Sequence, residues 1–308
     1  MNGRKNFLVY CAVPFAVIVI AIFAVGWYAS EKVIHPPVDP PLDPLKYPLL
    51  REDVYFKSRD GLKLAGWFIP GTNGATIILA HGRGSDHSHE LPNAVYLHAD
   101  GFSVFMFDFR YRGKSEGDAQ TLGAKESWDI QSAVDYLRTR HDVDPDRIGV
   151  QGNSLGAASA ILAAAETGEI KGVVAEIAFK SVNGVLNHTF PRIIGLPSFP
   201  FALVTKLICE FRLGVDLDEV APDKAIAKIS PRPVFLIDNS DDDLFPCDSV
   251  EVLYKAAKQP KVLWQVPGAP HGQGRQTAPE EYERRVLAFW RKTFVISSSR
   301  ASEERLPR

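Results

Sequence analysis

The sequence predicts a three-layer α/β domain with a mostly parallel sheet and a small helical cap, preceded by one N-terminal transmembrane helix. Three observations predict this organisation. A charge-free apolar run lies near the N-terminus, a proline-rich stretch follows it, and short apolar runs then alternate with helix-like patterns over residues 51–295. Strand and helix segments that alternate at this spacing are typical of a parallel sheet covered on both faces.

The apolar run holds no charged residue from Asn6 to Ser30. Residues 7–27 form a helix of about 32 Å at ~1.5 Å per residue, which matches the hydrocarbon thickness of a bilayer. Trp27 and Tyr28 lie at its C-terminal end, where interfacial aromatic side chains are expected. A cleaved signal peptide is the alternative, but its apolar core is usually shorter, and no small-x-small cleavage site stands out after the run. We therefore expect residues 7–28 to be an uncleaved signal-anchor.

Charges around the apolar run predict its orientation. Arg4 and Lys5 precede the run, whereas Glu31 and Lys32 cancel each other after it. Because positive charge stays on the cytoplasmic side of a membrane, residues 1–6 are expected in the cytoplasm and the rest of the chain on the non-cytoplasmic side.

Two segments are expected to lie outside the folded domain. Six prolines fall between residues 36 and 48. Proline fixes φ and lacks a backbone N–H, so this stretch is unsuited to helix interiors and central strands. We expect residues 29–50 to form an extended stalk and residues 296–308 to form a polar, flexible tail.

The domain itself begins with two strand-like runs between residues 52 and 70, around a turn signal at Asp60-Gly61. Short apolar runs of the kind found in a doubly covered sheet follow. They occupy residues 76–80, 103–109, 147–152, 172–178, 233–238 and 261–266. Helix-like patterns lie between them, with one apolar face each. Residues 181–230 break this alternation and are expected to form the helical cap.

Composition excludes several classes of protein. The chain has 35 Lys+Arg against 37 Asp+Glu and a net charge of −2, so it lacks the basic surface that nucleic-acid binding needs. Three cysteines are too few for a disulfide framework or a Cys-rich zinc module. The sequence leaves open whether Cys209 and Cys247 pair, and it does not determine the oligomeric state.

The strongest chemical signal is the sequence GNSLG at residues 152–156, which joins a predicted strand to a predicted helix. A serine hydroxyl is a weak nucleophile unless it is exposed and paired with a base. A tight strand-to-helix turn exposes Ser154, and the small residues Gly152 and Gly156 avoid collisions across that turn. The helix N-terminus also favours a developing negative charge.

A base and a carboxylate are expected later in the chain. His188 and His271 follow Ser154, and His271 lies in the loop after the last predicted strand, where the sites of open α/β sheets gather. His271 is therefore the expected base. The carboxylate is expected after the strand at 233–238, where the sequence offers four candidates: Asp238, Asp241, Asp242 and Asp243.

Residues 50–295 resemble the α/β-hydrolase superfamily, in particular the membrane-anchored serine hydrolases of the abhydrolase-domain type. The matching motifs are HG at 81–82, FDFRYRGKSEG at 107–117, GNSLG at 152–156, DDDLFP at 241–246 and PGAPHG at 267–272. The family's acid loop places the acid on Asp242, with Asp241 as its competitor. Asp238-Asn239 departs from the His-Gly usual at that place.

The resemblance implies a catalytic triad of Ser154, His271 and Asp242, and an oxyanion hole made of the backbone N–H groups of Arg83 and Leu155. It implies hydrolysis of carboxylic esters, including lipid or lysolipid acyl esters, through an acyl-enzyme and without a metal or other cofactor. A serine peptidase of the same fold and a catalytically silent, membrane-tethered binding module are the alternatives. A zinc cluster in HGRGSDHSHE at 81–90 is disfavoured, because Asp86 precedes His87 and His89 instead of following the order His-x-His-x-Asp-His, and no second cluster completes a site.

Overall fold

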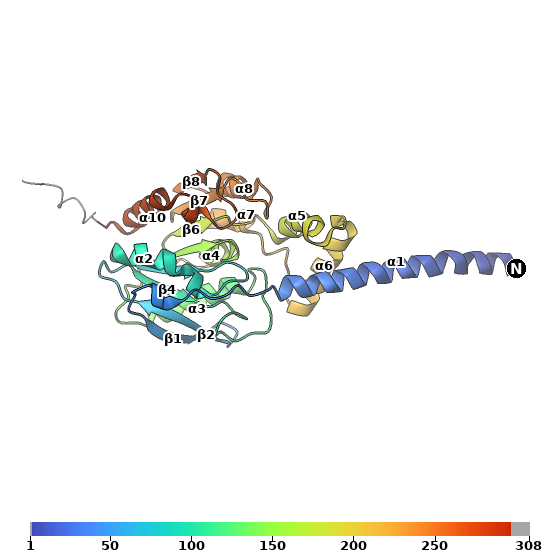
Figure 1. The fold of residues 1–308 in the computed structure, drawn as a ribbon, viewed down its shortest axis with the longest axis horizontal. Helices are drawn as coiled ribbons and strands as arrows, with labels where there is room; N and C mark the ends of the chain where they lie inside the picture. The colour runs from blue at the N-terminus through green and yellow to red at the C-terminus, as the bar shows by residue number, and fades with distance from the viewer. Residues whose placement is uncertain (1, 297–308) are drawn as a thin grey trace, which may run out of the picture.

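The computed structural model describes residues 2–296, with side chains from residue 12 onward. It confirms the predicted three-layer α/β domain, and Figure 1 shows the sheet between two layers of helices, with one long helix projecting from the domain. Apart from Ile296, the tail expected at 296–308 lies outside the described residues.

The sheet has eight strands in the order β1-β2-β4-β3-β5-β6-β7-β8. β1 and β2 form the predicted hairpin, β2 also pairs antiparallel with β4, and all other neighbours are parallel. The strands are β1 (Glu52–Lys57), β2 (Lys63–Ile69), β3 (Thr76–Ala80), β4 (Ser103–Phe107), β5 (Ile148–Asn153), β6 (Val173–Glu176), β7 (Val234–Asn239) and β8 (Lys261–Val266). Each predicted strand run is therefore present, to within a few residues at its ends.

Helices cover the two faces of the sheet. Successive side chains of a strand point to opposite faces, so Ile77 belongs to an apolar cluster with residues of α2 and α10, whereas Ile78 belongs to a cluster with residues of α3, α4 and α8. These helices are α2 (Leu91–Ala99), α3 (Glu126–Arg138), α4 (Leu155–Glu166), α8 (Ser249–Ala256) and α10 (Pro279–Phe294). Shorter helices are η2 (His87–Glu90), α7 (Pro222–Ala225), η3 (Ile226–Lys228) and α9 (Gly274–Thr277).

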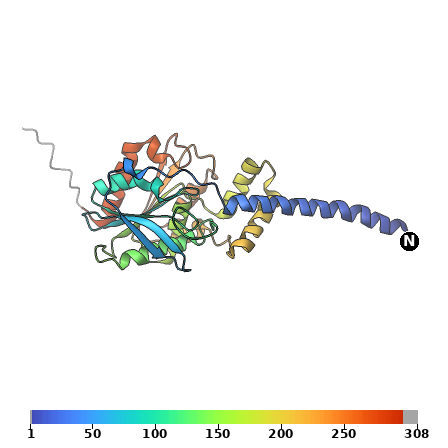
Figure 2. The same cartoon turned by 60° about the horizontal axis from the view of Figure 1, so that its bottom comes forward.

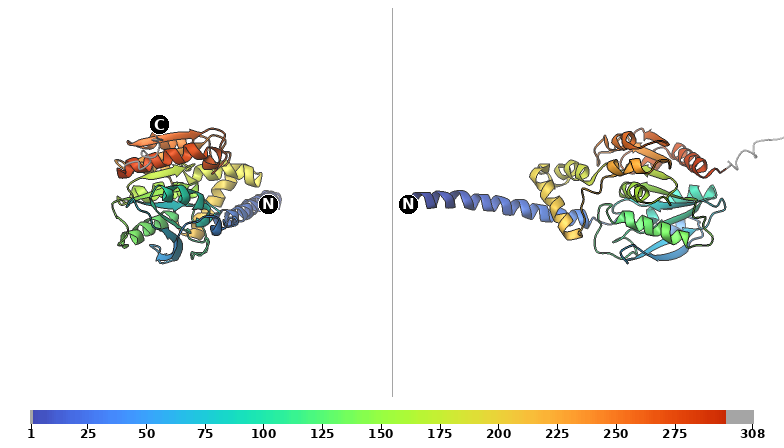
Figure 3. Two further views of the ribbon diagram at one scale, coloured as in Figure 1. Left: turned by 60° about the vertical axis from the view of Figure 1, so that its left-hand side comes forward. Right: turned by 180° about the vertical axis from the view of Figure 1, so that it is seen from behind.

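Helix α1 (Asn2–Ile34) is longer than the transmembrane segment expected at 7–28. Within its segment Ala12–Ile34, an 18-residue window has a mean hydropathy of 2.3, and the length and composition of the segment allow it to cross a membrane. An N-terminal signal sequence has the same properties. Figure 3 shows that most of α1 extends away from the domain.

The proline-rich segment differs from the free stalk expected at 29–50. α1 continues to Ile34, and the chain then runs along the domain with one short helix, η1 (Pro44–Lys46). The Leu42 N–H donates to Ser88 Oγ at 2.8 Å, and Leu42, Tyr47 and Leu49 pack against the core on the α2 face. Apolar residues between the prolines gain more by this burial than by remaining in water, so the segment is seated on the domain.

The insertion at 181–230 contains two helices, α5 (Val182–Ile194) and α6 (Ser198–Leu213), bent by 114° from one another. We call residues 182–213 the α5–α6 hairpin. Its buried side joins Leu155 and Ile34 in one apolar cluster through Val182, Leu186 and Cys209. The hairpin also packs against α1, where Figure 2 shows the two segments side by side. Cys209 and Cys247 are both free thiols.

One ion pair inside the domain yields a stability prediction. The Asp129 carboxylate is fully buried and accepts hydrogen bonds from the Arg110 backbone N–H at 3.1 Å, from Nε at 3.0 Å and from Nη2 at 2.7 Å. Asp129→Ala leaves part of a buried guanidinium unpaired and should lower the free energy of unfolding by about 3–5 kcal/mol. Thermal unfolding in detergent measures the change.

The matched control is Asp146→Ala, which removes an exposed partner of Lys171. Exposed ion pairs contribute little to stability, so this variant should unfold close to the wild-type temperature. Equal shifts for the two variants would contradict the role assigned to the buried pair.

Candidate active site

The turn between β5 and α4 is strained at Ser154. This residue has φ 54° and ψ −114°, a conformation that residues with a side chain rarely adopt. Two backbone hydrogen bonds hold it, from the Ser154 N–H to Glu176 O at 3.0 Å and from the Ala158 N–H to Ser154 O at 3.0 Å. Such strain is typical of a serine presented at the top of a parallel sheet.

Glycines make this turn possible. A Cβ at Gly156 would lie 2.0 Å from Ala80 O, and a Cβ at Gly152 would lie 2.5 Å from Gly156 C. Both contacts are with backbone atoms, which cannot rotate away. The helix therefore approaches the sheet as closely as it does only because both positions lack a side chain.

The structure brings Ser154, His271 and Asp242 together in one hydrogen-bonded chain. His271 Nε2 lies 3.1 Å from Ser154 Oγ, and His271 Nδ1 lies 2.8 Å from Asp242 Oδ2. The edge of the His271 ring meets Phe245, with ring centroids 4.8 Å apart. Ser154 is 6% exposed, whereas the His271 side chain is 22% exposed.

Asp242 is the carboxylate that meets His271. Burial raises the pKa of Asp242, but hydrogen bonds from His271 and from the backbone N–H groups of Leu244 and Phe245 outweigh it and hold that pKa below its usual value. Asp241 is engaged elsewhere, because its N–H donates to Ala269 O and its carboxylate accepts from Ser240 Oγ.

The sheet explains how residues so far apart in sequence meet. Ser154 follows β5, Asp242 follows β7 and His271 follows β8. Parallel neighbours end at the same edge of a sheet, so the loops after them converge. His188, the other histidine after Ser154, lies in α5 and does not take part in the hydrogen bonds between Ser154, His271 and Asp242.

The loop after β3, which contains Gly82 and Arg83, forms one side of the candidate site next to Ser154. A Cβ at Gly82 would lie 3.8 Å from Ser154 Cβ, so the loop that carries Arg83 passes beside the serine. Among the described residues, neither the Arg83 N–H nor the Leu155 N–H donates to a protein acceptor. Both N–H groups are therefore available to another oxygen.

The Arg83 side chain contacts the end of α1. Its Nη2 donates to Lys32 O at 2.9 Å and to Val33 O at 2.8 Å, and the Gln120 N–H donates to Ile34 O at 3.0 Å. The last carbonyls of a helix have no partner within it. The domain satisfies them here, so the apolar helix ends directly beside the candidate site.

Sequence reasoning missed Glu176, whose buried carboxylate supports the loops after β7 and β8. Glu176 Oε1 accepts from Asn239 Nδ2 at 3.1 Å and from the Gly274 N–H at 3.0 Å, and Oε2 accepts from Tyr282 Oη at 2.7 Å. Asn239 Nδ2 also donates to Pro270 O at 2.9 Å. The available signal was an acidic residue at the end of an otherwise apolar strand, since buried charges require partners.

The histidines of residues 81–90 do not converge on a common point. His81 Nε2 accepts from the Phe109 N–H at 3.0 Å, His87 Nδ1 lies 2.6 Å from Asp108, and His89 Nδ1 lies 3.2 Å from Asp86. Each ring thus has its own protein partner.

An acidic group elsewhere, on and beside α6, comprises Glu210, Asp216 and Asp218. The ammonium of Lys206 lies 3.0 Å from Glu210 and 2.7 Å from Asp218. A protein cation therefore already occupies the position that a metal ion would take.

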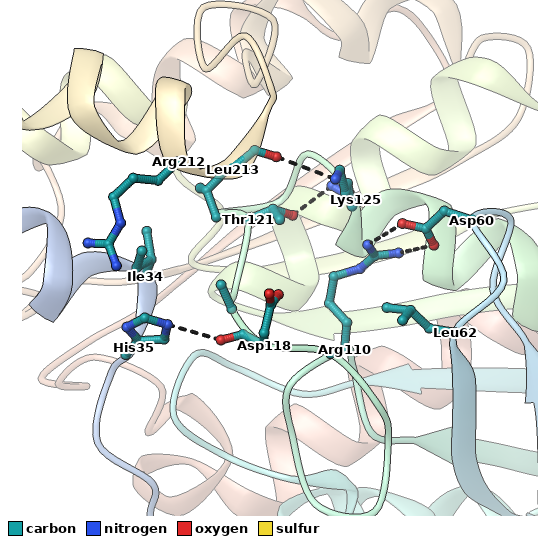
Figure 4. A pocket seen from close by; sticks show the side chains of 12 residues that line it. Ile34, His35, Asp60, Leu62, Arg110, Asp118, Thr121, Lys125, Arg212 and Leu213 are labelled. Carbon is teal, nitrogen blue, oxygen red and sulfur yellow. Dashed lines mark hydrogen bonds and ion pairs between the residues drawn. The ribbon is translucent and has the colours of Figure 1, made fainter.

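Two pockets lie near the candidate site. One of about 580 Å³ opens between the end of α1, the end of α6 and the loop after β4, and Figure 4 shows its charged lining with His35, Lys125 and Arg212. Neither Ser154 nor His271 lines it. A smaller pocket of about 100 Å³ reaches Asp242 and Phe245.

Known proteins match most of this chain, and one family model matches part of it. A family model described as X-Pro dipeptidyl-peptidase (S15 family) matches residues 45–191. The protein YfhR of Escherichia coli (strain K12) is 31% identical over 278 residues, which cover 87% of each chain. The alpha/beta hydrolase domain-containing protein WAV2 of Arabidopsis thaliana is 29% identical and covers 90% of this chain and 92% of its own.

Among solved structures, the Pyrococcus furiosus esterase Pf2001 superposes with a TM-score of 0.68 at 29% identity. The match covers 83% of this chain and 96% of the esterase chain. The similarity therefore extends over the whole domain rather than one motif.

The contact at Gly156 yields a prediction for the turn. Gly156→Ala places a methyl group against Ala80 O and should lower the free energy of unfolding by at least ~3 kcal/mol. Thermal unfolding measures this loss. Gly168→Ala is the control, because Gly168 is exposed and a Cβ there meets nothing within 4 Å. Wild-type stability of Gly156→Ala would show that α4 can move away from the sheet.

Proposed function

The chain belongs to the α/β-hydrolase superfamily, and from that premise we propose that it is a membrane-anchored serine hydrolase that cleaves carboxylic esters. The observation that carries the proposal is the continuous hydrogen-bonded chain from Ser154 through His271 to Asp242. A nucleophile, a base and an orienting carboxylate in this order are the requirements for acyl transfer by a serine.

In the proposed reaction, Ser154 Oγ attacks the ester carbonyl carbon while His271 Nε2 takes the hydroxyl proton. Asp242 accepts the Nδ1–H bond, which fixes the tautomer of the ring and stabilises its charged form. The tetrahedral intermediate collapses as His271 returns the proton to the leaving alcohol. Water, deprotonated by the same nitrogen, then attacks the acyl-serine. The bond from the acyl carbon to Ser154 Oγ breaks as His271 returns the proton to Oγ, and the carboxylic acid leaves.

The oxyanion is proposed to lie between the N–H groups of Arg83 and Leu155. Both N–H groups lack a protein acceptor, and the second belongs to the first turn of α4. Hydrogen-bond donors fixed in advance stabilise charge that develops in the transition state, and a helix N-terminus adds a favourable dipole.

Esters are preferred over peptides as the substrate. The Pyrococcus furiosus protein, similar over the whole domain, is an esterase. The peptidase family model supports the second candidate, a serine peptidase of the same fold, but it matches only residues 45–191. A catalytically silent binding module is disfavoured, because it has no need for an intact Ser–His–Asp chain.

Lipid or lysolipid acyl esters fit the surroundings of the serine. Ile34, Phe179 and Leu186 form a buried apolar cluster with Leu155, the residue after the nucleophile. In the proposed topology, α1 anchors the enzyme with its N-terminus in the cytoplasm and the domain on the other side. A substrate held in the adjacent bilayer then lies next to the catalytic domain.

The nucleophile is tested by covalent labelling. Ser154→Ala should abolish labelling of the full-length protein by a fluorophosphonate probe, because the probe needs an activated serine. Ser159→Ala is the matched control, since Ser159 is buried on the same helix and donates to Leu155 O. The control should label normally. Persistent labelling of Ser154→Ala would refute the assignment.

The carboxylate is tested by a pair of neighbouring substitutions. Asp242→Asn should lower kcat for p-nitrophenyl butyrate by about 10⁴-fold, because the amide disfavours the productive tautomer of His271. Asp241→Asn should change kcat little, since Asp241 makes no hydrogen bond to the histidine. A larger loss for Asp241→Asn would reverse the assignment. Parallel assays with X-Pro p-nitroanilides distinguish the esterase from the peptidase.

A further inference from the structure

We propose that the α5–α6 hairpin lies in the membrane interface beside α1, so that the lipid bilayer covers its exposed apolar face. The inference rests on the anchoring by α1 in the proposed function and not on the chemistry of Ser154. It names a second membrane-binding element, in the part of the chain that covers the candidate site.

The exposed face of α6 is entirely apolar. Between residues 201 and 213, the exposed side chains are those of Leu203, Leu207 and Phe211, with exposed fractions of 48%, 53% and 86%. At the bend of the hairpin, Ile193 and Phe199 are 64% and 76% exposed. A helix that faces water normally presents polar side chains on that side, so this face requires an apolar covering.

The other faces of α6 already have partners. Gly26 of α1 comes so close that a Cβ there would lie 2.7 Å from Val204 Cγ1. Arg212 donates to Ser30 Oγ at 3.1 Å and to Glu31 Oε2 at 2.7 Å. Small residues at such a contact permit the close packing that is typical of helices in membranes. The hairpin therefore lies at the same depth in the bilayer as the part of α1 on which it packs.

The exposure pattern along α1 indicates where the membrane–water interface lies. From residue 12 to residue 21 every side chain of α1 is exposed, and the segment is apolar on all sides. A helix that is hydrophobic all round belongs in a protein core or in a bilayer. The hairpin begins to cover α1 near Val25, and Trp27 and Tyr28 are exposed at the same level. Aromatic side chains of this kind lie at the membrane–water interface.

The bilayer is favoured over a second protein copy because the two apolar surfaces are continuous. Lipid that surrounds α1 also reaches the outer face of α6, which packs on it. On α6, Lys206 pairs with Glu210 and Asp218, and Arg212 pairs with Glu31. Burial of the apolar stripe therefore leaves these charges paired. At the bend, exposed Arg192 donates to His188 O at 2.8 Å, and an exposed arginine there can reach the lipid headgroups.

The placement has a consequence for the substrate. The inner side of the same hairpin joins Leu155 through Val182, Leu186 and Cys209. Only the α5–α6 hairpin then separates the acyl chain of an ester in the bilayer from Leu155, the residue after the nucleophile. Hydrolysis of long-chain esters in vesicles should depend on the exposed apolar face of the hairpin, whereas hydrolysis of soluble short-chain esters should not.

The experiment places a fluorophore on the hairpin of the full-length protein in phosphatidylcholine vesicles. Cys11 and Cys247 are replaced by serine, and Cys209 is kept because its thiol is buried. Leu207→Cys and Phe211→Cys are then labelled one at a time with the environment-sensitive probe NBD. Vesicles with brominated acyl chains quench a probe that touches lipid chains.

Two further label positions give the comparison. Ile20→Cys reports on α1 itself, and Tyr55→Cys reports on an exposed site of β1 in the domain. We expect blue-shifted emission and strong quenching at positions 20, 207 and 211, and neither effect at position 55. Absence of quenching at 207 and 211, with quenching at 20, would overturn the proposal.

A blue shift at 207 and 211 without quenching by brominated chains would also overturn it, because a second copy of the chain would then cover the face. Absence of quenching at all positions would refute both this proposal and the anchoring by α1.

A second variant separates membrane docking from catalysis. Leu207→Asn with Phe211→Asn should lower kcat/KM about tenfold for a monoacyl ester embedded in vesicles, because apolar area is lost from the docking face. Hydrolysis of soluble p-nitrophenyl butyrate should be unchanged. If the wild-type protein hydrolyses neither ester, the proposed chemistry fails, while the fluorescence result still decides the placement of the hairpin.

Discussion

At Gly156 the first turn of α4 comes so close to the sheet that a single methyl group would overlap Ala80 O. The position of the site depends on this contact. It sets how sharply the chain turns after β5, and so it holds Ser154 in a conformation that a longer turn would relax. It also brings the N-terminus of α4 and the loop after β3 to the same side of the serine. The strain at one residue is maintained because the packing around it leaves no room for relief.

A buried carboxylate extends this constraint to the rest of the site. Glu176 holds Ser154 through its backbone oxygen, and its side chain binds Asn239 and Gly274, which lie beside the loops that carry Asp242 and His271. A buried charge with several donors is stable only while all of them stay in place. Asp238-Asn239 stands where the resembling family more often has His-Gly, and here the Asn239 amide joins Glu176 to Pro270 O. The departure from the family pattern thus has a local structural explanation.

The apolar helix and the domain form one structural unit. Arg83 and Gln120 satisfy the last carbonyls of α1, and Arg212 of α6 pairs with Glu31 just before them. The proline-rich chain that follows is seated on the domain by Leu42, Tyr47 and Leu49. A free stalk would let the domain rotate relative to the helix, whereas these contacts hold the candidate site at a constant distance from the end of α1.

The sequence by itself determined the strands, the order of helices, the apolar N-terminal helix and the turn at Ser154. Periodicity, turn residues and glycine spacing are local properties, and each can be read from a few neighbouring positions. The residues alone left four aspartates open as the partner of His271, and only the resemblance favoured Asp242, which the structure places beside that histidine. Tertiary structure alone decided that Glu176 braces the loops and that residues 35–50 lie on the domain. It also decided that α6 packs on α1. Each of these features depends on contacts between segments far apart in the chain. A local sequence pattern does not predict which of several similar side chains the fold brings together.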